Sequence, residues 1–420
     1  MARLFSRIAK EKRMSHRILM IGAFDVKGEE YDYFKKLIEE DGNEVIAMDF
    51  GTYPDAGLFK VDITNDQVAA AGGGDLKKLQ EEKDRGNAMK VMSVGVSVLT
   101  KKLYEEAGFD GIVGLGGSGG TGIITSAMRS LPIGIPKIMV STVASGDTSF
   151  YVGLKDITMI PSIVDVAGIN QISEKIFRQA AGAVCGMVKM DYTTRGNEKP
   201  IITASMFGQT TPCVSRCREI LQSEGYEVLI FHGSGAGGKT MEAMVEEGYV
   251  KAVLDITTTE WSDELLGGIL TAGKHRLEAP GKAGIPHLIV PGCIDMVNYG
   301  PPDTVPEKYR GRNFYQSKPT TTLMRTNVEE NRQLGKIFAQ KANNAKGPVE
   351  FLIPLQGFSV TDSEGGPFWW PEADQAFLTT LKNNLNPEIK VVELDNHIND
   401  NEFSETAVEM LLNMIQFQVK

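Results

Sequence analysis

The chain has 420 residues, of which 42% are hydrophobic and 23% are charged, values typical of a soluble globular protein. Because one hydrophobic core rarely grows beyond about 300 residues, this length predicts two domains. The formal net charge of −10 argues against a general nucleic-acid or anionic-membrane surface, and no apolar run is long enough to predict a membrane span.

Residues 1–14, MARLFSRIAKEKRM, contain five basic residues and one acidic residue, and they carry no folding signal. They lack the apolar segment of a secretory signal. We expect a disordered basic extension here, and a short organelle-targeting helix is the alternative.

From residue 16 to residue 142, short apolar runs alternate with amphipathic stretches. Strands are expected at residues 16–24, 44–51, 90–96, 109–117 and 134–142. Continuous apolar runs separated by helices are typical of a parallel sheet that helices cover on both faces. The first half is therefore predicted to be a doubly wound α/β domain, in which ligands bind at the carboxyl ends of the strands.

The first expected strand is followed by the polar turn Asp25-Val26-Lys27-Gly28. In this position Lys27 would bind a phosphate and Asp25 a metal ion or a hydroxyl group, so both are candidate catalytic residues. The alternative is a capping turn, in which Asp25 accepts backbone N–H groups at the start of the next helix.

The stretch GLGGSGGTG, Gly114–Gly122, contains six glycines and follows a buried run. The glycines let a ligand approach the backbone, and the helix expected after them favours an anion at its N-terminus. The loop after the next expected strand, residues 134–142, would lie beside these glycines. A tight turn without a ligand is the alternative. The predicted nucleotide-binding residues are Gly116, Gly117, Ser118, Gly119, Gly120, Thr121, Thr142, Ser145 and Gly146.

The polar segment 191–200 contains a glycine and ends in proline, as linkers do. It divides the chain into an expected N-terminal domain, residues 15–195, and an expected C-terminal domain, residues 196–420. Residues 291–326 are rich in loops, and the similar openings of the two halves suggest an internal duplication. We predict two Rossmann-like doubly wound α/β domains with mainly parallel sheets and a cleft between them. Strands of the second are expected at residues 201–208, 226–233, 250–257, 287–292, 349–357 and 389–396.

The second glycine loop, GSGAGGKT at Gly233–Thr240, fits the P-loop pattern G-x-x-x-x-G-K-T letter for letter. A P-loop normally follows the first strand of its domain, whereas this loop follows the second. The next aspartate, Asp255, lies only 16 residues beyond Lys239, which is a short crossover for a P-loop protein. We therefore place the nucleotide in the first domain and assign Gly235 and Gly238 to a second small molecule.

Four further residues are candidates. Asp255 and Glu260 follow a buried strand and would form a carboxylate pair for substrate binding and acid–base chemistry, or cap the next helix. Arg325 would clamp an anion, because a guanidinium forms paired hydrogen bonds, or it would form an interdomain salt bridge. His397 would act as a general base oriented by Asp400, or it is a structural histidine.

The four cysteines, Cys185, Cys213, Cys217 and Cys293, do not form a metal-binding pattern with any histidine. We expect no metal site among them and free thiols in a reducing compartment, and therefore a cytoplasmic protein.

Several motifs resemble one known family along nearly the whole chain. They include GLGGSGGTG, LPIGIPKIMVSTVASGD, MFGQTTPCV, LDITTTEWSDELLGG, RLEAPGKAGIPHLIVPGCIDMVNYG and HINDNEF. The family is the one that contains the tomato mosaic virus resistance protein. This resemblance implies two Rossmann-like domains, ATP as ligand, dimerisation and, in the plant member, inhibition of a viral RNA replication protein.

We therefore expect a homodimer that binds ATP, with Mg²⁺, and a second small molecule, and that binds neither nucleic acid nor membranes. Its function would be that of an ATP-dependent small-molecule enzyme. The alternative is a nucleotide-stabilised interaction module without turnover. An NAD-type oxidoreductase ranks last, because G-x-G-x-x-G followed by an acidic ribose anchor is missing.

Overall fold

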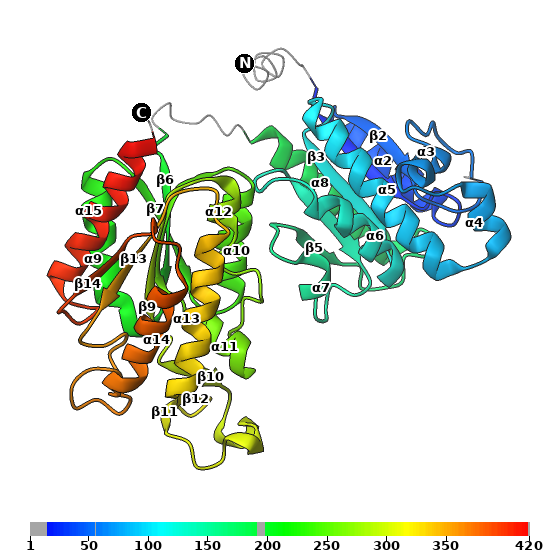
Figure 1. The fold of residues 1–420 in the computed structure, drawn as a ribbon. Coiled ribbons are helices and arrows are strands. Elements are labelled where there is room, and N and C mark those ends of the chain that lie inside the picture. The colour runs from blue at the N-terminus through cyan, green and yellow to red at the C-terminus, as the bar shows by residue number, and fades with distance from the viewer. Residues whose placement is uncertain (1–14, 55, 191–197, 419–420) are drawn as a thin grey trace. The chain divides into compact units, whose positions relative to one another are not determined.

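The computed structural model of the chain describes residues 15–54, 56–190 and 198–418 (Figure 1). The chain divides into two compact units, residues 1–193 and residues 194–420. The basic extension expected at residues 1–14 and most of the expected linker, residues 191–197, lie outside the described residues. The cleft expected between the two domains stays a prediction.

The first unit is built on a five-stranded parallel sheet in the order β2-β1-β3-β4-β5. Nearly every residue of β1, β3 and β4 is buried, as expected of a sheet covered on both faces. The strands are β1 (Arg17–Gly22), β2 (Glu44–Asp49), β3 (Gly111–Gly116), β4 (Lys137–Ser141) and β5 (Thr158–Pro161).

Helices cover both faces of this sheet. Ile18 and Met20 point to one face, where α2 (Gly28–Glu40) and α8 (Gln171–Lys189) pack. Leu19 and Ile21 point to the other face, and the helices there complete a second core. The predicted doubly wound α/β architecture is therefore confirmed. The helices on the second face are α3 (Asn65–Ala71), α4 (Leu76–Glu82), α5 (Arg85–Glu105) and α6 (Ser118–Arg129), and the short α7 (Ser149–Val152) follows β4.

The strand expected at residues 90–96 is wrong, because these residues lie within the long helix α5. Four of its five buried residues, Ala88, Met92, Val96 and Thr100, are spaced four positions apart, which is the spacing of a helix face and not of a strand. Asp84 caps the helix by accepting hydrogen bonds from the backbone N–H groups of Gly86 and Asn87.

The second unit contains a six-stranded sheet in the order β14-β13-β9-β8-β6-β7, again parallel throughout. All six strands expected from the sequence are confirmed. They are β6 (Ile201–Met206), β7 (Glu227–His232), β8 (Val250–Thr257), β9 (His287–Gly292), β13 (Val349–Pro354) and β14 (Val391–Leu394).

The helices of the second unit also lie on both faces of its sheet (Figure 1). The first group, α9 (Thr211–Ser223) and α15 (Asn401–Gln418), packs on one face with Leu254 and Val290. The second group packs on the other face of the sheet, with Ile289 and Phe351. It contains α11 (Glu260–Leu266), α13 (Val328–Asn343) and α14 (Pro371–Asn384), while α10 (Ala236–Glu246) and α12 (Ala279–Ala283) form a smaller core with Val253.

Residues 291–326, expected to be mainly loop, contain a small antiparallel sheet in the order β10-β12-β11. Its strands are β10 (Met296–Tyr299), β11 (Phe314–Lys318) and β12 (Thr321–Arg325). Each has only four or five residues, and all of β11 is exposed, so neither length nor apolar periodicity identified them.

The two parallel sheets share one strand order. In each, the second strand in sequence pairs on one side of the first strand, and the third strand pairs on its other side. This common order agrees with the internal duplication suggested by the sequence. It also gives each unit a switch point, between β1 and β3 and between β6 and β8, where doubly wound sheets bind ligands.

Candidate functional site

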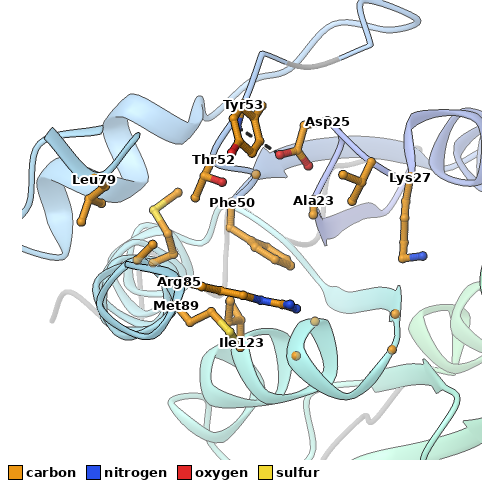
Figure 2. A pocket seen from close by; sticks show the side chains of 18 of the residues that line it. Ala23, Asp25, Lys27, Phe50, Thr52, Tyr53, Leu79, Arg85, Met89 and Ile123 are labelled. Carbon is orange, nitrogen blue, oxygen red and sulfur yellow. Dashed lines mark hydrogen bonds between the residues drawn. The ribbon is translucent and has the colours of Figure 1, made fainter. Parts of the chain in front are cut away.

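A pocket of about 580 Å³ lies at the switch point of the first unit (Figure 2). The turn after β1 contributes Asp25 and Lys27, the segment after β2 contributes Phe50 and Gly51, and the loop after β3 contributes glycines. The pocket therefore brings together two predicted site segments, the turn after β1 and the glycine loop after β3.

The start of α6 forms one wall of the pocket, through Gly116, Gly117, Ser118, Gly119 and Gly120. Gly117 is the N-cap residue and has no side chain to cap the helix. The first backbone N–H groups of a helix have no acceptor within it, so this wall presents hydrogen-bond donors and the positive end of the helix dipole.

Thr121 and the loop after β4 support this wall from outside the pocket. The Thr121 hydroxyl is buried and lies 2.6 Å from that of Ser141 on β4. The Thr142 N–H donates to the Gly116 carbonyl at 3.2 Å. Ser145 and Gly146 are exposed and do not line the pocket. Of the predicted nucleotide-binding residues, those from Gly116 to Gly120 line the pocket, and the others lie behind or beside it.

Cationic side chains reach the pocket from the junction of α4 and α5. Lys83, with a positive φ of 53°, and Arg85 both line it. Figure 2 shows the Arg85 guanidinium extending toward the start of α6, and its Nη2 atom lies 3.9 Å from the position of a Cβ on Gly119. Arg85 was not among the predicted residues, because a strand was expected at residues 90–96 and no helix was expected to begin at residue 85.

Asp25 and Lys27 line the pocket but do not pair with each other. The Asp25 carboxylate accepts a hydrogen bond from the Tyr53 N–H at 3.0 Å, and the Lys27 ammonium donates to the Val166 carbonyl. Helix α2 has no side-chain cap, so the alternative interpretation of Asp25 as a helix cap is wrong.

The remaining wall of the pocket is apolar. Leu79 comes from α4, and Ala88, Met89 and Met92 come from α5. Phe50 extends into the pocket between Asp25 and Arg85 in Figure 2. A flat apolar group fits against this wall, while the opposite side offers hydrogen-bond donors and positive charge.

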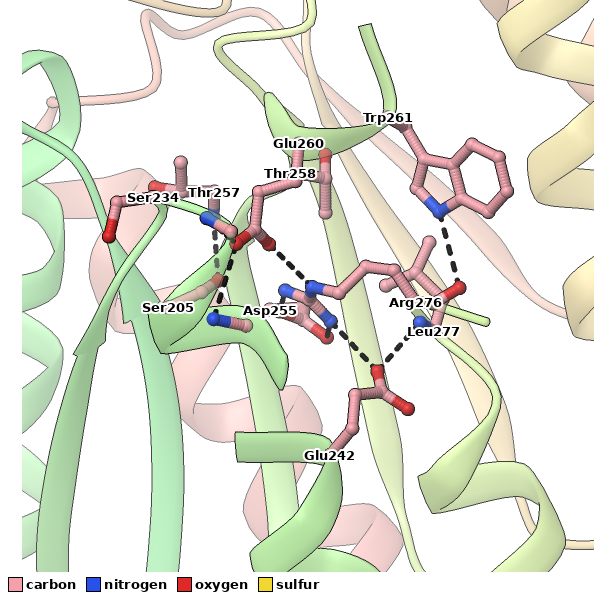
Figure 3. A network of polar contacts seen from close by, with 12 residues as sticks. Ser205, Ser234, Glu242, Asp255, Thr257, Thr258, Glu260, Trp261, Arg276 and Leu277 are labelled. Carbon is pink, nitrogen blue, oxygen red and sulfur yellow. Dashed lines mark hydrogen bonds and ion pairs between the residues drawn. The ribbon is translucent and has the colours of Figure 1, made fainter. Parts of the chain in front are cut away.

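The P-loop-like segment of the second unit already holds a carboxylate (Figure 3). The backbone N–H groups of Gly235 and Gly238 donate to Oε1 of Glu260 at 2.8 and 3.2 Å. Glu260 is 1% exposed, and the Lys239 side chain at the start of α10 is exposed. Glu260 therefore occupies the position where a P-loop would hold a phosphate oxygen.

Arg276 joins Glu260 to Asp255 inside the second unit. Its Nε donates to Glu260 at 2.6 Å, its Nη1 donates to Asp255 at 2.9 Å, and His287 contacts Asp255 at 2.8 Å. Burial raises the pKa of the Asp255 carboxyl, but Arg276 and His287 more than offset this, so the pKa lies below its usual value. Burial dominates at Glu260 and raises its pKa.

Arg325 is also buried and bound within the second unit. Its Nη2 donates to Asp374 at 2.6 Å and to Asp362 at 3.3 Å, and its Nε donates to the Phe368 carbonyl at 2.7 Å. To bind a substrate anion, Arg325 would have to exchange these partners. The salt bridge anticipated as the alternative lies inside one unit.

His397 uses both ring nitrogens for backbone contacts. Nε2 lies 2.9 Å from the Ser359 carbonyl, and Nδ1 lies 3.2 Å from the backbone N of Asn399. The Asp400 carboxylate accepts the backbone N–H of His397, whereas the hydrogen bonds of the ring in the described part of the chain go to Ser359 and Asn399. A role as general base would require these contacts to open, and it stays a prediction.

Sequence reasoning also missed Arg276, His287 and Asp362, although all three are buried in charged networks. Arg276 lies within RLEAPGKAG, between predicted elements, and no local spacing links it to Asp255. The described residues contain no group of three or more His, Cys, Asp or Glu side chains arranged to hold a metal ion. Within the same residues, no helix combines the length and apolar character needed to cross a bilayer.

Both units of the chain match the models of one known protein family. Residues 16–193 match the N-terminal domain of the uncharacterised protein family UPF0261, and residues 199–415 match its C-terminal domain. The chain belongs to this family. A UPF0261 protein of Clostridium tetani is 49% identical over 404 residues, which cover 96% of this chain and 100% of that protein.

The UPF0261 chain is also similar to the ToMV resistance protein Tm-1(GCR237) of Solanum lycopersicum. The two are 40% identical over 339 residues, which are 78% of this chain and 44% of the tomato protein. The relation to the tomato resistance protein implied by the sequence motifs is confirmed. Among solved structures, a UDP-N-acetylglucosamine 2-epimerase matches with 11% identity and a TM-score of 0.23, covering 97% of this chain and 98% of that one.

Proposed function

We propose that the first unit binds ATP, with its magnesium ion, in the pocket between β1 and β3. One observation carries this proposal: the pocket combines the uncapped start of α6, the Arg85 guanidinium and an apolar wall at a switch point. The phosphates would bind at Gly117–Gly120, and Arg85 would neutralise part of their charge. The adenine would pack against Leu79 and Met89.

The test is calorimetric titration of ATP and Mg²⁺ into the protein and into Gly117→Asp. A Cβ on Gly117 meets only the Thr142 hydroxyl, at 3.8 Å, so an aspartate fits and its main effect is a negative charge where the phosphates would lie. We expect binding to weaken by about a hundredfold or more.

Two variants serve as controls for this titration. Gly182→Asp adds the same charge at an exposed position on α8 with no atom within 4 Å of its Cβ. Lys239→Ala removes the lysine of the P-loop-like segment. Both should bind ATP as the wild type does. Loss of binding in Lys239→Ala alone would move the nucleotide to the second unit, and no binding by the wild type would overturn the proposal.

We further propose that binding serves an ATP-dependent reaction on a second small molecule, for which Gly235, Gly238, Asp255 and Arg325 were predicted. Their present partners are internal, so a substrate would have to displace them. The alternative is a nucleotide-stabilised interaction module, which the name of the tomato relative, a ToMV resistance protein, favours. Steady release of ADP would support the enzyme hypothesis. Binding of ATP without release of ADP would support the interaction module.

The homodimer and the cytoplasmic location also stay proposals. All four cysteines are buried free thiols, which supports a reducing compartment. Light scattering coupled to gel filtration gives the mass of the particle, and a mass near that of one 45.8 kDa chain would exclude the dimer under those conditions.

A further inference from the structure

Helix α4 contributes a polar side chain to the apolar end of the pocket. Leu79 and Gln80 are the α4 residues that line it. Figure 2 shows Leu79 apart from the Arg85 guanidinium, which extends toward the start of α6. Helix α4 therefore lies at the end of the pocket where the base of a nucleotide would pack. Leu79 is buried, whereas Gln80 is partly exposed, so a ligand can reach its side chain.

The orientation of the Gln80 amide is fixed by a backbone contact. Its Nε2 donates to the carbonyl of Thr52, a residue that also lines the pocket. A carbonyl oxygen can only accept a hydrogen bond, so the NH₂ group must face Thr52 and Oε1 must point away from that carbonyl. No hydrogen bond reaches Oε1 from the described residues. Gln80 therefore offers an oriented acceptor that no protein group uses.

Purine bases differ in what they present to such an acceptor. At position 6, adenine carries an amino group, which donates hydrogen bonds, and guanine carries an oxygen, which accepts them. Hypoxanthine, the base of inosine nucleotides, also carries an oxygen at this position. An amide oxygen pairs with the amino group of adenine and is repelled by an oxygen in its place. The free acceptor of Gln80 thus matches adenine.

We propose, on the basis of the nucleotide site above, that Gln80 accepts a hydrogen bond from the 6-amino group of adenine and makes the pocket selective against 6-oxo purines. The Thr52 carbonyl is the positioning group, because it holds the amide in the orientation that discriminates between the bases. A purely structural glutamine, which only tied α4 to the segment after β2, would affect all nucleotides equally.

The test compares ATP and inosine triphosphate, each with Mg²⁺, by calorimetry. We expect the wild type to bind ATP about tenfold or more tightly than inosine triphosphate. Gln80→Met keeps the length of the side chain and removes the acceptor, so ATP binding should weaken and the ratio should fall toward one. Gln179→Met makes the same change at an exposed position on α8 outside the pocket lining and should keep the wild-type ratio.

The outcomes separate this inference from the proposal on which it rests. If the wild type binds neither nucleotide, the nucleotide site itself is wrong. If it binds both equally, the site stands and the role of Gln80 is overturned, whether or not Gln80→Met folds. A Gln80→Met variant that binds both more weakly but keeps the wild-type ratio would also overturn it, because Gln80 would then only support α4.

Discussion

At the scale of single residues, Arg325 shows how a buried arginine is held by neighbouring carboxylates. Asp362 and Asp374 bind its guanidinium, and Asp295, bound to the Ser359 hydroxyl at 2.8 Å, lies close enough to interact with the same group. One positive charge thus faces three carboxyl groups, and burial raises the pKa of Asp295 to about 6. Burial, with the charges of Asp295 and Asp374, raises the pKa of Asp362 to about 9.

The raised pKa of Asp362 predicts a pH dependence of stability. An unfolded aspartate titrates near pH ~3.9, so between about pH 4 and about pH 9 the folded chain retains a proton that the unfolded chain has lost. The free energy of unfolding of the second unit should therefore fall as pH rises, by up to about 1.4 kcal/mol per pH unit for one proton. Urea unfolding between pH 6 and pH 8.5 measures this slope.

Asp362→Asn should reduce that slope, because asparagine does not titrate and its amide oxygen still accepts the Phe358 N–H that Asp362 now binds. Asp303→Asn, at an exposed position in the same unit, should keep the wild-type slope. Equal slopes in the wild type and Asp362→Asn would show that this carboxyl is ionised in the folded protein. Tryptophan fluorescence isolates the unit, because Trp261, Trp369 and Trp370 are the three tryptophans of the chain.

Sequence reasoning found Asp255 and Glu260 from their place at a buried strand, where ligand-binding residues gather, and Arg325 from the ability of a guanidinium to clamp an anion. It could not find their partners, because Arg276 lies 21 residues from Asp255 and Asp362 lies 37 residues from Arg325. Ion pairs at such separations depend on the packing of whole elements. The residues lining the first pocket were easier to find, since Gly116–Gly120 and Asp25 directly follow adjacent strands.

At the scale of elements, continuous apolar runs predicted the strands of both parallel sheets except β5. They gave a wrong prediction at residues 90–96, where helix packing determines the structure. The run at residues 90–96 is rich in valine, a residue common in strands. It is nevertheless helical, and Gly95, which has no Cβ, lets α5 pack directly against the backbone carbonyl of Val68 in α3. A helix–helix contact of this kind overrides local β preference. The strand β11 is exposed, and β10, although buried, has only four residues, so neither gave a recognisable strand pattern.

The start of α10 offers a test at this scale. A Cβ on Gly238 would overlap the Glu260 carboxylate, which Arg276 and two N–H groups hold in place. Gly238→Ala should therefore destabilise the second unit by about 1–3 kcal/mol, despite the better helix propensity of alanine. Urea unfolding followed by tryptophan fluorescence measures the change.

The matched variant is Gly186→Ala, an exposed helix position on α8 whose Cβ meets nothing within 4 Å. It should stabilise the first unit by up to about 1 kcal/mol, as followed by circular dichroism. If Gly238→Ala were as stabilising, Glu260 would not be held firmly at the N-terminus of α10.

At the scale of the whole molecule, the two parallel sheets have the same strand order, but different groups lie at their switch points. The first has an open pocket beside an uncapped helix, and in the second the carboxylate of Glu260 binds the start of α10. ATP at a hundred times its dissociation constant would stabilise the first unit by about 2.7 kcal/mol and leave the second unchanged. Thermal unfolding followed by circular dichroism and by tryptophan fluorescence separates the two transitions, and a shift of the fluorescence transition alone would contradict this.

The internal carboxylate of Glu260 has a consequence for how the two units would respond to the ATP level in a cell. The second unit supplies this carboxylate from its own sequence, so the start of α10 has an acceptor for its N–H groups without a bound ligand. The first unit, if it binds ATP, is most resistant to unfolding when energy is plentiful. Depletion of ATP would then make the first unit easier for proteases to cleave, and it would not remove the carboxylate at the start of α10.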